Sequence, residues 1–278
     1  DIAPGARVVV STDTSAEDVH FRAGWFDPAE VGWRAATSAL SDLAAMAARP
    51  LGLVLAASVP PRWRDALPEI GDGIGDAAAA VSCPIVGGDL TGGRDLVLTV
   101  TVVGEAEHPV SRGGAHVGDA LYVTGRLGGP RRALEALLRG ALPDAADRAR
   151  FARPRARLAE ARWLAAHGAR ALVDLSDGLV ADAGHIAAAS GCDLAIDPHA
   201  VPRVGGATVD EALRGGEEYE LICAAPPTLE ARAFTATFGL ELTRIGAVVA
   251  ASPGGPRVVI ADGGGRVDLP GGYDHFTR

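Results

Sequence analysis

Three short acidic motifs follow apolar, strand-like runs in this sequence. They are Val8–Asp13 (VVVSTD), Ile85–Asp89 (IVGGD) and Leu172–Asp177 (LVDLSD), and a fourth acid, Asp42, lies on or near the start of a predicted helix. Because α/β proteins place ligands at the carboxyl ends of their strands, we expect these acids to share one ligand site. Crowded carboxylates repel one another unless cations lie between them. Their hard oxygen atoms suit Mg²⁺, which bridges carboxylates to substrate phosphates.

The lack of lysine restricts how this chain could hold a phosphate. All 26 basic residues are arginine. A Walker-type phosphate loop and Schiff-base chemistry each require a lysine, so both are excluded. Metal ions would then neutralise a polyphosphate. A simpler interpretation stays open for each single motif, namely that the Asp caps a turn or a helix. It does not explain why each strand end carries the same acid.

Other motifs give weaker signals. Gly125–Gly129 (GRLGG), between a predicted strand and helix, could hold a phosphate at the helix N-terminus, but the signal is weak and favours an ordinary turn. No GxGxxG motif opens a helix after a strand, so a dinucleotide fold is not supported. Cys83, Cys192 and Cys223 share no CxxC spacing. We therefore expect buried thiols rather than a disulfide framework or a zinc site.

Composition and charge exclude several classes of protein. The 278 residues are 48% hydrophobic and 22% charged, which is typical of a globular protein with one large or two medium domains. A net charge of −9 disfavours a nucleic-acid-binding protein. No apolar run approaches the roughly 20 residues that a membrane helix needs, and no signal peptide is recognised. The sequence predicts a cytoplasmic protein that binds neither nucleic acid nor membrane.

Apolar, β-branched runs alternate with Ala- and Leu-rich stretches, which predicts an α/β protein. In the first half, the expected strands are Arg7–Ser11, Leu51–Val59, Pro84–Val86 and Leu96–Gly104, and the expected helices are Val31–Ala48 and Trp63–Ala80. Gly71, Gly73 and Gly75 weaken the second helix prediction. The polar, Gly- and Pro-rich segment Glu105–Gly118 indicates a junction between domains at residues 1–110 and 111–278.

The second half shows the same alternation. Its expected strands are Ala120–Thr124, Ala171–Leu175, Glu220–Ala224 and Arg244–Val249, and its expected helices are Arg131–Arg139, Arg155–His167 and Leu179–Ser190. Two further runs, Arg257–Ala261 and Arg266–Leu269, flank a Gly-rich turn and predict a hairpin.

Seven motifs, in order, resemble those of the thiamine-monophosphate kinase family. They are STDT (11–14), VHF (19–21), LSDLAAM (40–46), GGD (87–89), DLSDGL (174–179), GGEEYEL (215–221) and GGYDHF (271–276). The match extends over nearly the whole chain, and SDLAAM and GYDHF are its most specific parts.

This resemblance implies a two-domain fold like that of aminoimidazole ribonucleotide synthetase. The N-terminal domain would pair with a second copy to form a β-barrel-like homodimer interface, and the C-terminal domain would close the active-site cleft. Leu51–Val59 and Leu96–Gly104 are the strands that we expect at this interface. The implied reaction is direct in-line transfer of phosphate from ATP to thiamine monophosphate, with Mg²⁺ and without a phosphoenzyme. The product would be thiamine diphosphate.

The resemblance also implies roles for individual residues. The Mg²⁺ ligands would be Ser11 (through its backbone), Thr12, Asp13, Asp42, Asp89, Asp174 and, for a further ion, Asp177. The ATP contacts would be Gly88, Asp89, Arg112 and Ser176. The thiamine monophosphate contacts would be His20, Glu217 and Tyr273. No side chain is expected to act as a general base, because the attacking phosphate oxygen is already ionised. Outside these motifs, His20 could simply pack and Tyr273 could be a hydrophobic anchor.

The sequence departs from the family pattern at several positions. Ala39 stands for an Asn, Leu90 for a Thr and Glu218 for an Asp. The family's Gly-Asp-Asp stretch is expected upstream of Asp1. These departures keep a second hypothesis open, a non-catalytic nucleotide-binding homologue. Another ATP-using enzyme of the superfamily is a third. Selenophosphate synthetases carry a reactive Cys or selenocysteine near the N-terminus, the hydrogenase-maturation relative ends in Cys, and aminoimidazole ribonucleotide synthetase lacks the SDLAAM and GYDHF pair.

Overall fold

The computed structural model describes residues 2–261, and the chain divides into two compact units. The chain up to Pro109 forms unit 1 together with Ala152–Ala159, and Val110–Phe151 forms unit 2 together with the chain from Glu160 onward. The first division falls beside the junction expected from the sequence. The return of Ala152–Ala159 to unit 1 had no sequence signal.

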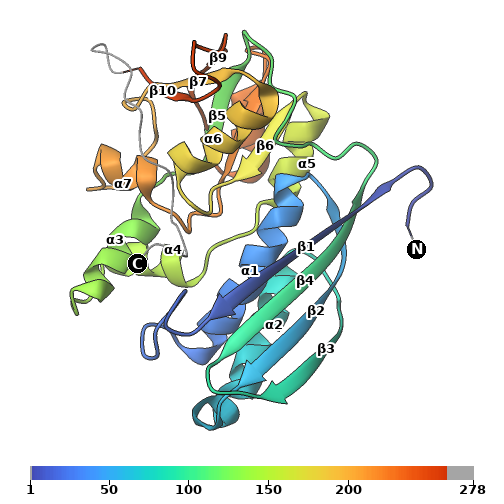
Figure 1. Ribbon diagram of the computed structural model, residues 1–278, viewed down its shortest axis with the longest axis vertical. Helices are drawn as coiled ribbons and strands as arrows, with labels where there is room; N and C mark the ends of the chain where they lie inside the picture. Colours follow the sequence, from blue (N-terminus) through green and yellow to red (C-terminus); the bar gives the residue numbers. More distant parts are fainter. Residues whose placement is uncertain (1, 262–278) are drawn as a thin grey trace. The chain divides into compact units, whose positions relative to one another are not determined.

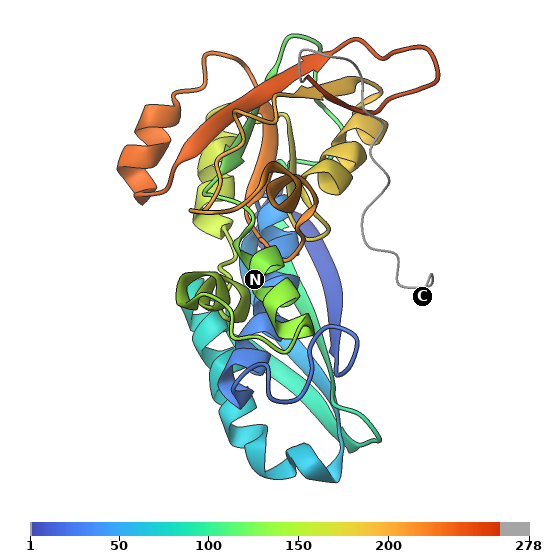
Figure 2. The same ribbon diagram turned by 90° about the vertical axis from the view of Figure 1, so that its left-hand side faces the viewer.

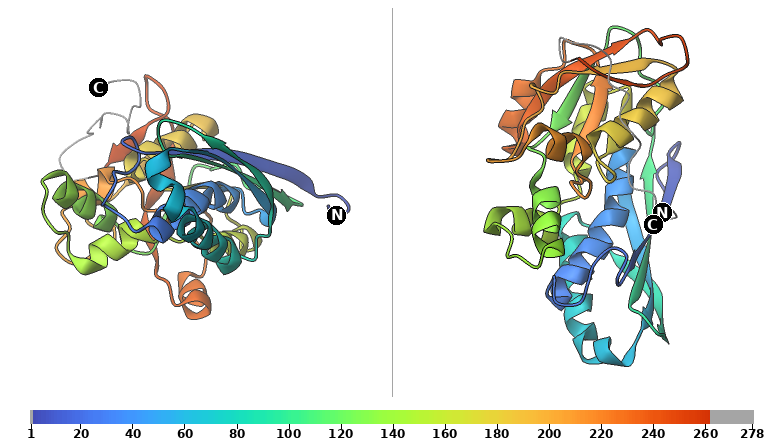
Figure 3. Two further views of the ribbon diagram at one scale, coloured as in Figure 1. Left: turned by 90° about the horizontal axis from the view of Figure 1, so that it is seen from below. Right: turned by 60° about the vertical axis from the view of Figure 1, so that its left-hand side comes forward.

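Unit 1 is built on one sheet with two helices against one of its faces (Figure 1). Its strand order is β1-β4-β2-β3, where β2 and β3 run parallel and the other neighbours run antiparallel. The strands are β1 (Arg7–Ala16), β2 (Arg49–Val59), β3 (Ile85–Gly92) and β4 (Val97–Ala106). The helices are α1 (Pro28–Ala45) and α2 (Leu67–Ala80), and a 3₁₀ turn, η1 (Pro61–Ala66), precedes α2. Both helices lie on the same face in every view (Figure 2, Figure 3).

Two glycines allow α1 and α2 to pack closely. A Cβ added at Gly32 would lie 2.0 Å from the Ile70 carbonyl oxygen, and one at Gly73 would lie 1.8 Å from the Ala29 carbonyl oxygen. Gly73, which weakened the helix prediction, is therefore required where the two backbones meet. Helix α1 begins after Asp27, where Asp27 and Glu30 form a capping box.

The other face of this sheet carries threonines and exposed apolar side chains. Thr12 pairs with Thr101, and Thr14 with Thr99, at 3.0 Å between their hydroxyl oxygens. On β4, alternate residues such as Val100 are fully buried toward the helices. The exposed apolar residues of unit 1 strands are Val8, Val10, Val54, Ile85, Val86 and Leu90. They lie mainly on the edge strands β1 and β3.

Within the described residues, unit 2 is built on a six-stranded sheet in the order β10-β7-β9-β5-β8-β6. The strands are β5 (Ala120–Thr124), β6 (Ala171–Asp174), β7 (Asp193–Ile196), β8 (Leu221–Ala225), β9 (Leu242–Val249) and β10 (Val258–Ile260). The helices are α3 (Gly129–Leu138), α4 (Ala145–Ala152), α5 (Leu158–Ala166), α6 (Leu179–Ser190), α7 (Val209–Arg214) and α8 (Ala231–Phe238). Of the two runs expected to form a hairpin, the first contains β10, which pairs in parallel with β7. Residues 266–269 lie outside the described part.

The core of unit 2 is buried on both faces of the sheet. Leu121, Val173 and Ile222 face a cluster that includes Leu179 and Ile186 of α6. The residues that alternate with them on the same strands, Tyr122, Leu172 and Cys223, are also buried. These strands are therefore continuous apolar runs in the sequence, which made them easy to predict. Among the described helices of both units, none is long and apolar enough to cross a membrane.

Candidate active site

One acidic group of unit 1 is assembled from β1 and the last turn of α1. The Ser11 hydroxyl donates a hydrogen bond to Asp42 Oδ2 at 2.5 Å. Asp13, two residues further along β1, lies on the same face of the strand as Ser11 and is partly buried. Asp42 lies near the C-terminal end of α1, not near a helix start as the sequence had indicated. Thr12 points to the opposite face, where its side chain contacts Thr101, so only its backbone remains beside Asp13.

Asp89 lies apart from Asp13 and Asp42 within unit 1. It is in β3, on the opposite edge of the sheet from β1, with β4 and β2 between them. Three strand spacings separate the two edges by about 14 Å. Asp13 and Asp89 both lie inside strands rather than at their ends, which corrects the expected placement. Gly88 is required beside Asp89, because a Cβ there would lie 2.3 Å from the Leu55 carbonyl oxygen.

His20 lies in the loop after β1, where its ring and its backbone both form hydrogen bonds with Ala16. Its ring Nδ1 accepts a hydrogen bond from the Ala16 backbone N–H at 3.0 Å. The backbone N–H of His20 donates to the Ala16 carbonyl oxygen at 2.9 Å. An Nδ1 that accepts cannot carry the proton of a neutral imidazole. The neutral ring therefore carries its proton on Nε2 and presents a donor there.

Glu17 anchors this loop and was missed from the sequence. Its side chain is 7% exposed, and Oε2 accepts hydrogen bonds from Arg62 at 2.7 Å, Trp63 Nε1 at 3.0 Å and the Leu96 N–H at 3.4 Å. Burial by itself would raise the pKa of Glu17, but these hydrogen bonds and the charge of Arg62 lower it overall. No sequence pattern distinguishes this Glu from an exposed one.

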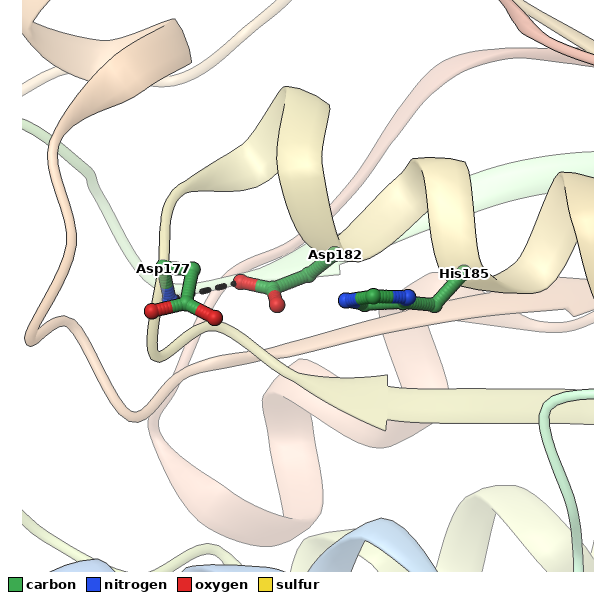
Figure 4. A group of neighbouring side chains, drawn as sticks. All are labelled: Asp177, Asp182 and His185. Atoms are coloured by element: carbon green, nitrogen blue, oxygen red, sulfur yellow. Dashed lines mark hydrogen bonds between the residues drawn. The ribbon is translucent and has the colours of Figure 1, made fainter. Parts of the chain in front are cut away.

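In unit 2, the DLSDG segment forms a turn between β6 and α6. Asp174 is the last residue of β6 and is buried, Ser176 is partly buried, and Asp177 is exposed. Gly178 has φ +114°, and a Cβ there would lie 2.9 Å from the Arg214 backbone, so glycine is required. Asp182 of α6, which the sequence did not single out, accepts a hydrogen bond from the Asp177 N–H (Figure 4) and another from the Gly178 N–H.

Asp177, Asp182 and His185 form a cluster with metal-binding side chains. One ligand atom from each lies within 4.8 Å of the others. Burial, together with the negative charges of Asp174 and Asp177, raises the pKa of Asp182 to about 8. A divalent cation would offset this crowding of negative charge. The carboxylate oxygens fit a hard ion such as Mg²⁺, whereas the His185 ring is less typical of that ion.

A second loop, Gly215–Glu220, lies directly against this turn. The Glu217 N–H donates to the Ser176 carbonyl oxygen at 2.8 Å, and the N–H groups of Glu218 and Tyr219 donate to the Leu175 carbonyl oxygen at 3.1 and 2.9 Å. Glu217 and Tyr219 have φ values of +65° and +52°, which are costly for residues other than glycine. The Tyr219 hydroxyl donates to Glu217 Oε2 at 3.0 Å. The structure thus brings Glu217 and Ser176 together.

Glu218 occupies the N-terminus of α3. Its Oε1 accepts the Gly128 N–H in a short hydrogen bond, and burial raises the pKa of Glu218 to about 8. The GRLGG turn was one candidate for phosphate binding. The Gly128 N–H is instead satisfied by a protein carboxylate, which leaves the ordinary-turn interpretation.

Arg112 lies at the other end of α6 from Asp177. Its carbonyl oxygen accepts a hydrogen bond from Ser190, the last residue of that helix, at 3.1 Å. The 12 residues of α6 span about 18 Å. A nucleotide that contacts Arg112 and Ser176 together would have to extend along most of this helix. Tyr273 lies outside the described residues.

Comparisons with known proteins agree on one family. The model "AIR synthase related protein, N-terminal domain" matches residues 1–106, and "AIR synthase related protein, C-terminal domain" matches residues 116–259. The thiamine-monophosphate kinase of Halobacterium salinarum is 36% identical over 229 residues, which cover 80% of this chain and 78% of that protein.

Two solved structures are similar in fold and sequence. The crystal structure of the thiamine-monophosphate kinase from Stenotrophomonas maltophilia K279a has a TM-score of 0.86 at 34% identity, with 93% of this chain and 86% of that chain covered. The structure of AaThiL complexed with AMPPCP and TMP has a TM-score of 0.87 at 30% identity, with coverage of 98% and 88%. The two-domain α/β fold expected from the sequence is therefore confirmed.

Proposed function

Because this chain belongs to the thiamine-monophosphate kinase family of phosphotransferases, we propose that it converts thiamine monophosphate and ATP to thiamine diphosphate with the help of Mg²⁺. A relative of the same fold that was solved with AMPPCP and TMP supports this choice of substrates. Within the chain itself, the strongest support is the backbone bond between Ser176, a proposed ATP contact, and Glu217, a proposed acceptor contact.

The chain's own acids are suited to a reaction that consists mainly of positioning. We assign Asp174 and Asp177 of unit 2 to Mg²⁺. In unit 1 we assign Asp13 and Asp42, with the backbone around Ser11 and Thr12, to Mg²⁺, and Asp89, on the opposite edge of the sheet, to a separate ion. When bound, Mg²⁺ supplies charge neutralisation for the phosphates. The acceptor phosphate oxygen is already ionised near neutral pH, so no side chain has to remove a proton before an in-line attack. Arg112 can pair with phosphate oxygens through its guanidinium fork.

The acceptor contacts follow from the hydrogen-bonding state of each side chain. We assign the Nε2–H of His20 as a donor to thiamine monophosphate, because Nδ1 is engaged with Ala16. Glu217, held by the Tyr219 hydroxyl, is an acceptor for a donor group of the same substrate. Tyr273 completes this assignment as a flat aromatic surface for a cationic ring.

A homodimer and a cytoplasmic location are parts of the same proposal. Exposed apolar side chains on the open sheet face of unit 1, among them Val10 and Val86, support pairing with a second copy. They lie mainly on β1 and β3, whereas the sequence pointed to β2 and β4. The cysteines Cys83, Cys192 and Cys223 are free and buried, which is consistent with a reducing compartment. Light scattering at micromolar protein concentration tests the dimer, and a monomeric mass would exclude it.

The experiment that tests the activity is an assay of thiamine diphosphate formation from thiamine monophosphate, ATP and Mg²⁺. Unphosphorylated thiamine is the matched negative acceptor. We expect product only with the monophosphate and only with the metal. Nucleotide binding without product would favour the non-catalytic homologue. Turnover of a different acceptor would favour another enzyme of the superfamily.

The non-catalytic hypothesis has little support at Glu218, one of the positions that motivated it. The carboxylate of Glu218 is buried on the Gly128 N–H, so its longer side chain has a structural partner. Ala39 is fully buried in α1 and Leu90 is 61% exposed on β3, and neither contributes a polar group to the turn or loop described above.

A further inference from the structure

Asp182 is a buried carboxylate whose hydrogen-bond partners lie in the turn that carries Asp177. Its side chain is 2% exposed, and Oδ2 accepts the N–H groups of Asp177 and Gly178 at 3.1 Å each. Its own N–H donates to the Gly178 carbonyl oxygen at 3.0 Å. The first turn of α6 and the DLSDG turn are therefore joined by three hydrogen bonds around one residue.

The backbone of this turn has few alternatives. Gly178 adopts φ +114°, and a Cβ there would lie 2.9 Å from the Arg214 backbone. The Ser176 carbonyl oxygen is held by the Glu217 N–H. Because Ser176 and Gly178 are both fixed, the two hydrogen bonds to Asp182 determine the direction in which the Asp177 side chain points away from the backbone. Figure 4 shows the side chains of Asp177 and Asp182 next to each other, with Asp177 at the start of the helix.

We propose that Asp182 is a positioning residue for Asp177, and that it sets the geometry with which this turn binds Mg²⁺. The proposal rests on the proposed function, which assigns Asp177 to the metal. Asp182 acts through hydrogen bonds to backbone N–H groups, so its role requires an acceptor oxygen and not a negative charge. A direct ligand would require the charge. This difference makes the two roles separable by experiment.

The test compares Asp182→Asn with Asp182→Ala in the full chain. Asn keeps an acceptor oxygen near the Oδ2 position, whereas Ala removes it. Isothermal titration calorimetry measures Mg²⁺ binding in the presence of AMPPCP. For Asp182→Ala we expect the Mg²⁺ dissociation constant to rise about 10- to 100-fold, the usual effect of losing a residue that orients a ligand. For Asp182→Asn we expect a change below about threefold, because the acceptor is retained.

Asp193→Ala is the matched control. Asp193 is also buried in unit 2, and it accepts the N–H groups of Ser252 and Arg257 at 3.1 and 3.0 Å, but it lies on β7, far along the sheet from β6. We expect this variant to lose thermal stability and to keep its Mg²⁺ affinity. If Asp193→Ala weakened Mg²⁺ binding as much as Asp182→Ala, the effect would be general loosening of the unit, and the proposal would be wrong.

Two other results would overturn the proposal. If Asp182→Asn lost as much Mg²⁺ affinity as Asp182→Ala, the charge of Asp182 would be required and the residue would be a direct ligand. If neither variant changed the affinity, the turn would not depend on Asp182. Should Asp182→Ala fail to fold, Asp182→Glu replaces it, because it keeps the charge but displaces the acceptor, and it is expected to weaken binding more than Asn does. The titration contains no thiamine monophosphate, so failure of the proposed activity would leave this measurement unaffected.

Discussion

The hydrogen bond between His20 and Ala16 leads to a prediction that separates the two nitrogens of one ring. His20→Asn places an amide oxygen near Nδ1, where it can still accept the Ala16 N–H, but leaves nothing at Nε2. His20→Gln places an amide N–H near Nε2 and gives up the contact with Ala16. If the Nε2–H binds the acceptor substrate, Gln should retain activity better than Asn. If the ring only supports the loop, Asn should be the better replacement.

The size of the effect follows from the kind of bond that is lost. A hydrogen bond to a neutral group contributes about 1 kcal/mol, and one to a charged group about 1.5–3 kcal/mol. With about 1.4 kcal/mol for each factor of ten, His20→Asn should raise KM for thiamine monophosphate about 10- to 100-fold. His20→Gln should raise it only about threefold, because the donor is kept. KM for ATP should stay within about twofold for both variants, because the second substrate makes no use of this donor.

Steady-state assays with each substrate varied in turn, together with thermal unfolding of each variant, are the measurements. His20→Ala, which removes both contacts, should combine the loss of substrate affinity with a loss of about 1 kcal/mol in the free energy of unfolding. Equal losses for ATP and thiamine monophosphate, or better activity from Asn than from Gln, would refute the assignment of Nε2.

Three further predictions concern the acids and the loop of unit 2. Asp13→Asn should abolish phosphate transfer at saturating Mg²⁺ while thermal stability is kept or slightly raised, since one of several crowded charges is removed; near-normal turnover would contradict the metal assignment. Tyr219→Phe removes one hydrogen bond from Glu217 and should raise KM for thiamine monophosphate about three- to tenfold with little change in KM for ATP; an equal change in both would point to a general packing defect. Asp182 and Glu218 both have a folded-state pKa of about 8, above their ordinary values of 3.8 and 4.5. The folded protein therefore binds more protons than the unfolded one between those values, and without Mg²⁺ its free energy of unfolding should fall as pH rises through that range. The free energy of unfolding should fall by at most about 1.4 kcal/mol per pH unit for each group. Thermal unfolding measured against pH should detect this fall, and Glu218→Gln should make it smaller. Stability that rises with pH would show the opposite linkage.

The elements that the sequence predicted best are those with both a clear apolar pattern and a clear end. Strand β5 is a buried apolar run that stops at Gly125, and helix α6 ends at Gly191, which adopts φ +68° as its C-cap. Their predicted bounds agree with the structure. Strand β7 and helix α7 have four and six residues, too few for a period to be recognised.

The positions of Asp89 and Asp42 within their elements were predicted wrongly, because only the residues next to each of them were considered. Strand β3 was predicted to end at Val86, because glycines are disfavoured in strands. It continues to Gly92, because Gly88 fits closely against β2, and Asp89 therefore lies inside the strand. Asp42 was placed on or near a helix start, although Asp27, Pro28 and Glu30 mark the true start well before it.

The residues that the sequence did not reveal act through contacts between distant segments. Glu17 and Tyr219 have no local pattern that distinguishes them. The partners of Glu17 come from η1 and from Leu96, just before β4, and the partner of Tyr219 is Glu217, which adopts a left-handed conformation. Asp182 had one usable signal, an acid in the first turn of a helix that follows a Gly turn. That signal predicts a cap, and only the structure shows that the capped N–H groups belong to Asp177 and Gly178.

The hydrogen bonds of unit 2 explain how two unfavourable backbone conformations can persist in one loop. Glu217 and Tyr219 each adopt a left-handed φ that costs of the order of 1 kcal/mol. The N–H groups of residues 217–219 all donate to carbonyl oxygens of Leu175 or Ser176, and Glu218 fixes the same loop to the start of α3 through Gly128. Each of these bonds contributes about as much as one strained residue costs. The loop is therefore held against the DLSDG turn, and the longer Glu side chain at position 218 takes part in holding it there. A substitution that frees Glu218 from Gly128 would act on Glu217 and on Ser176 together, because their backbones are bonded to each other.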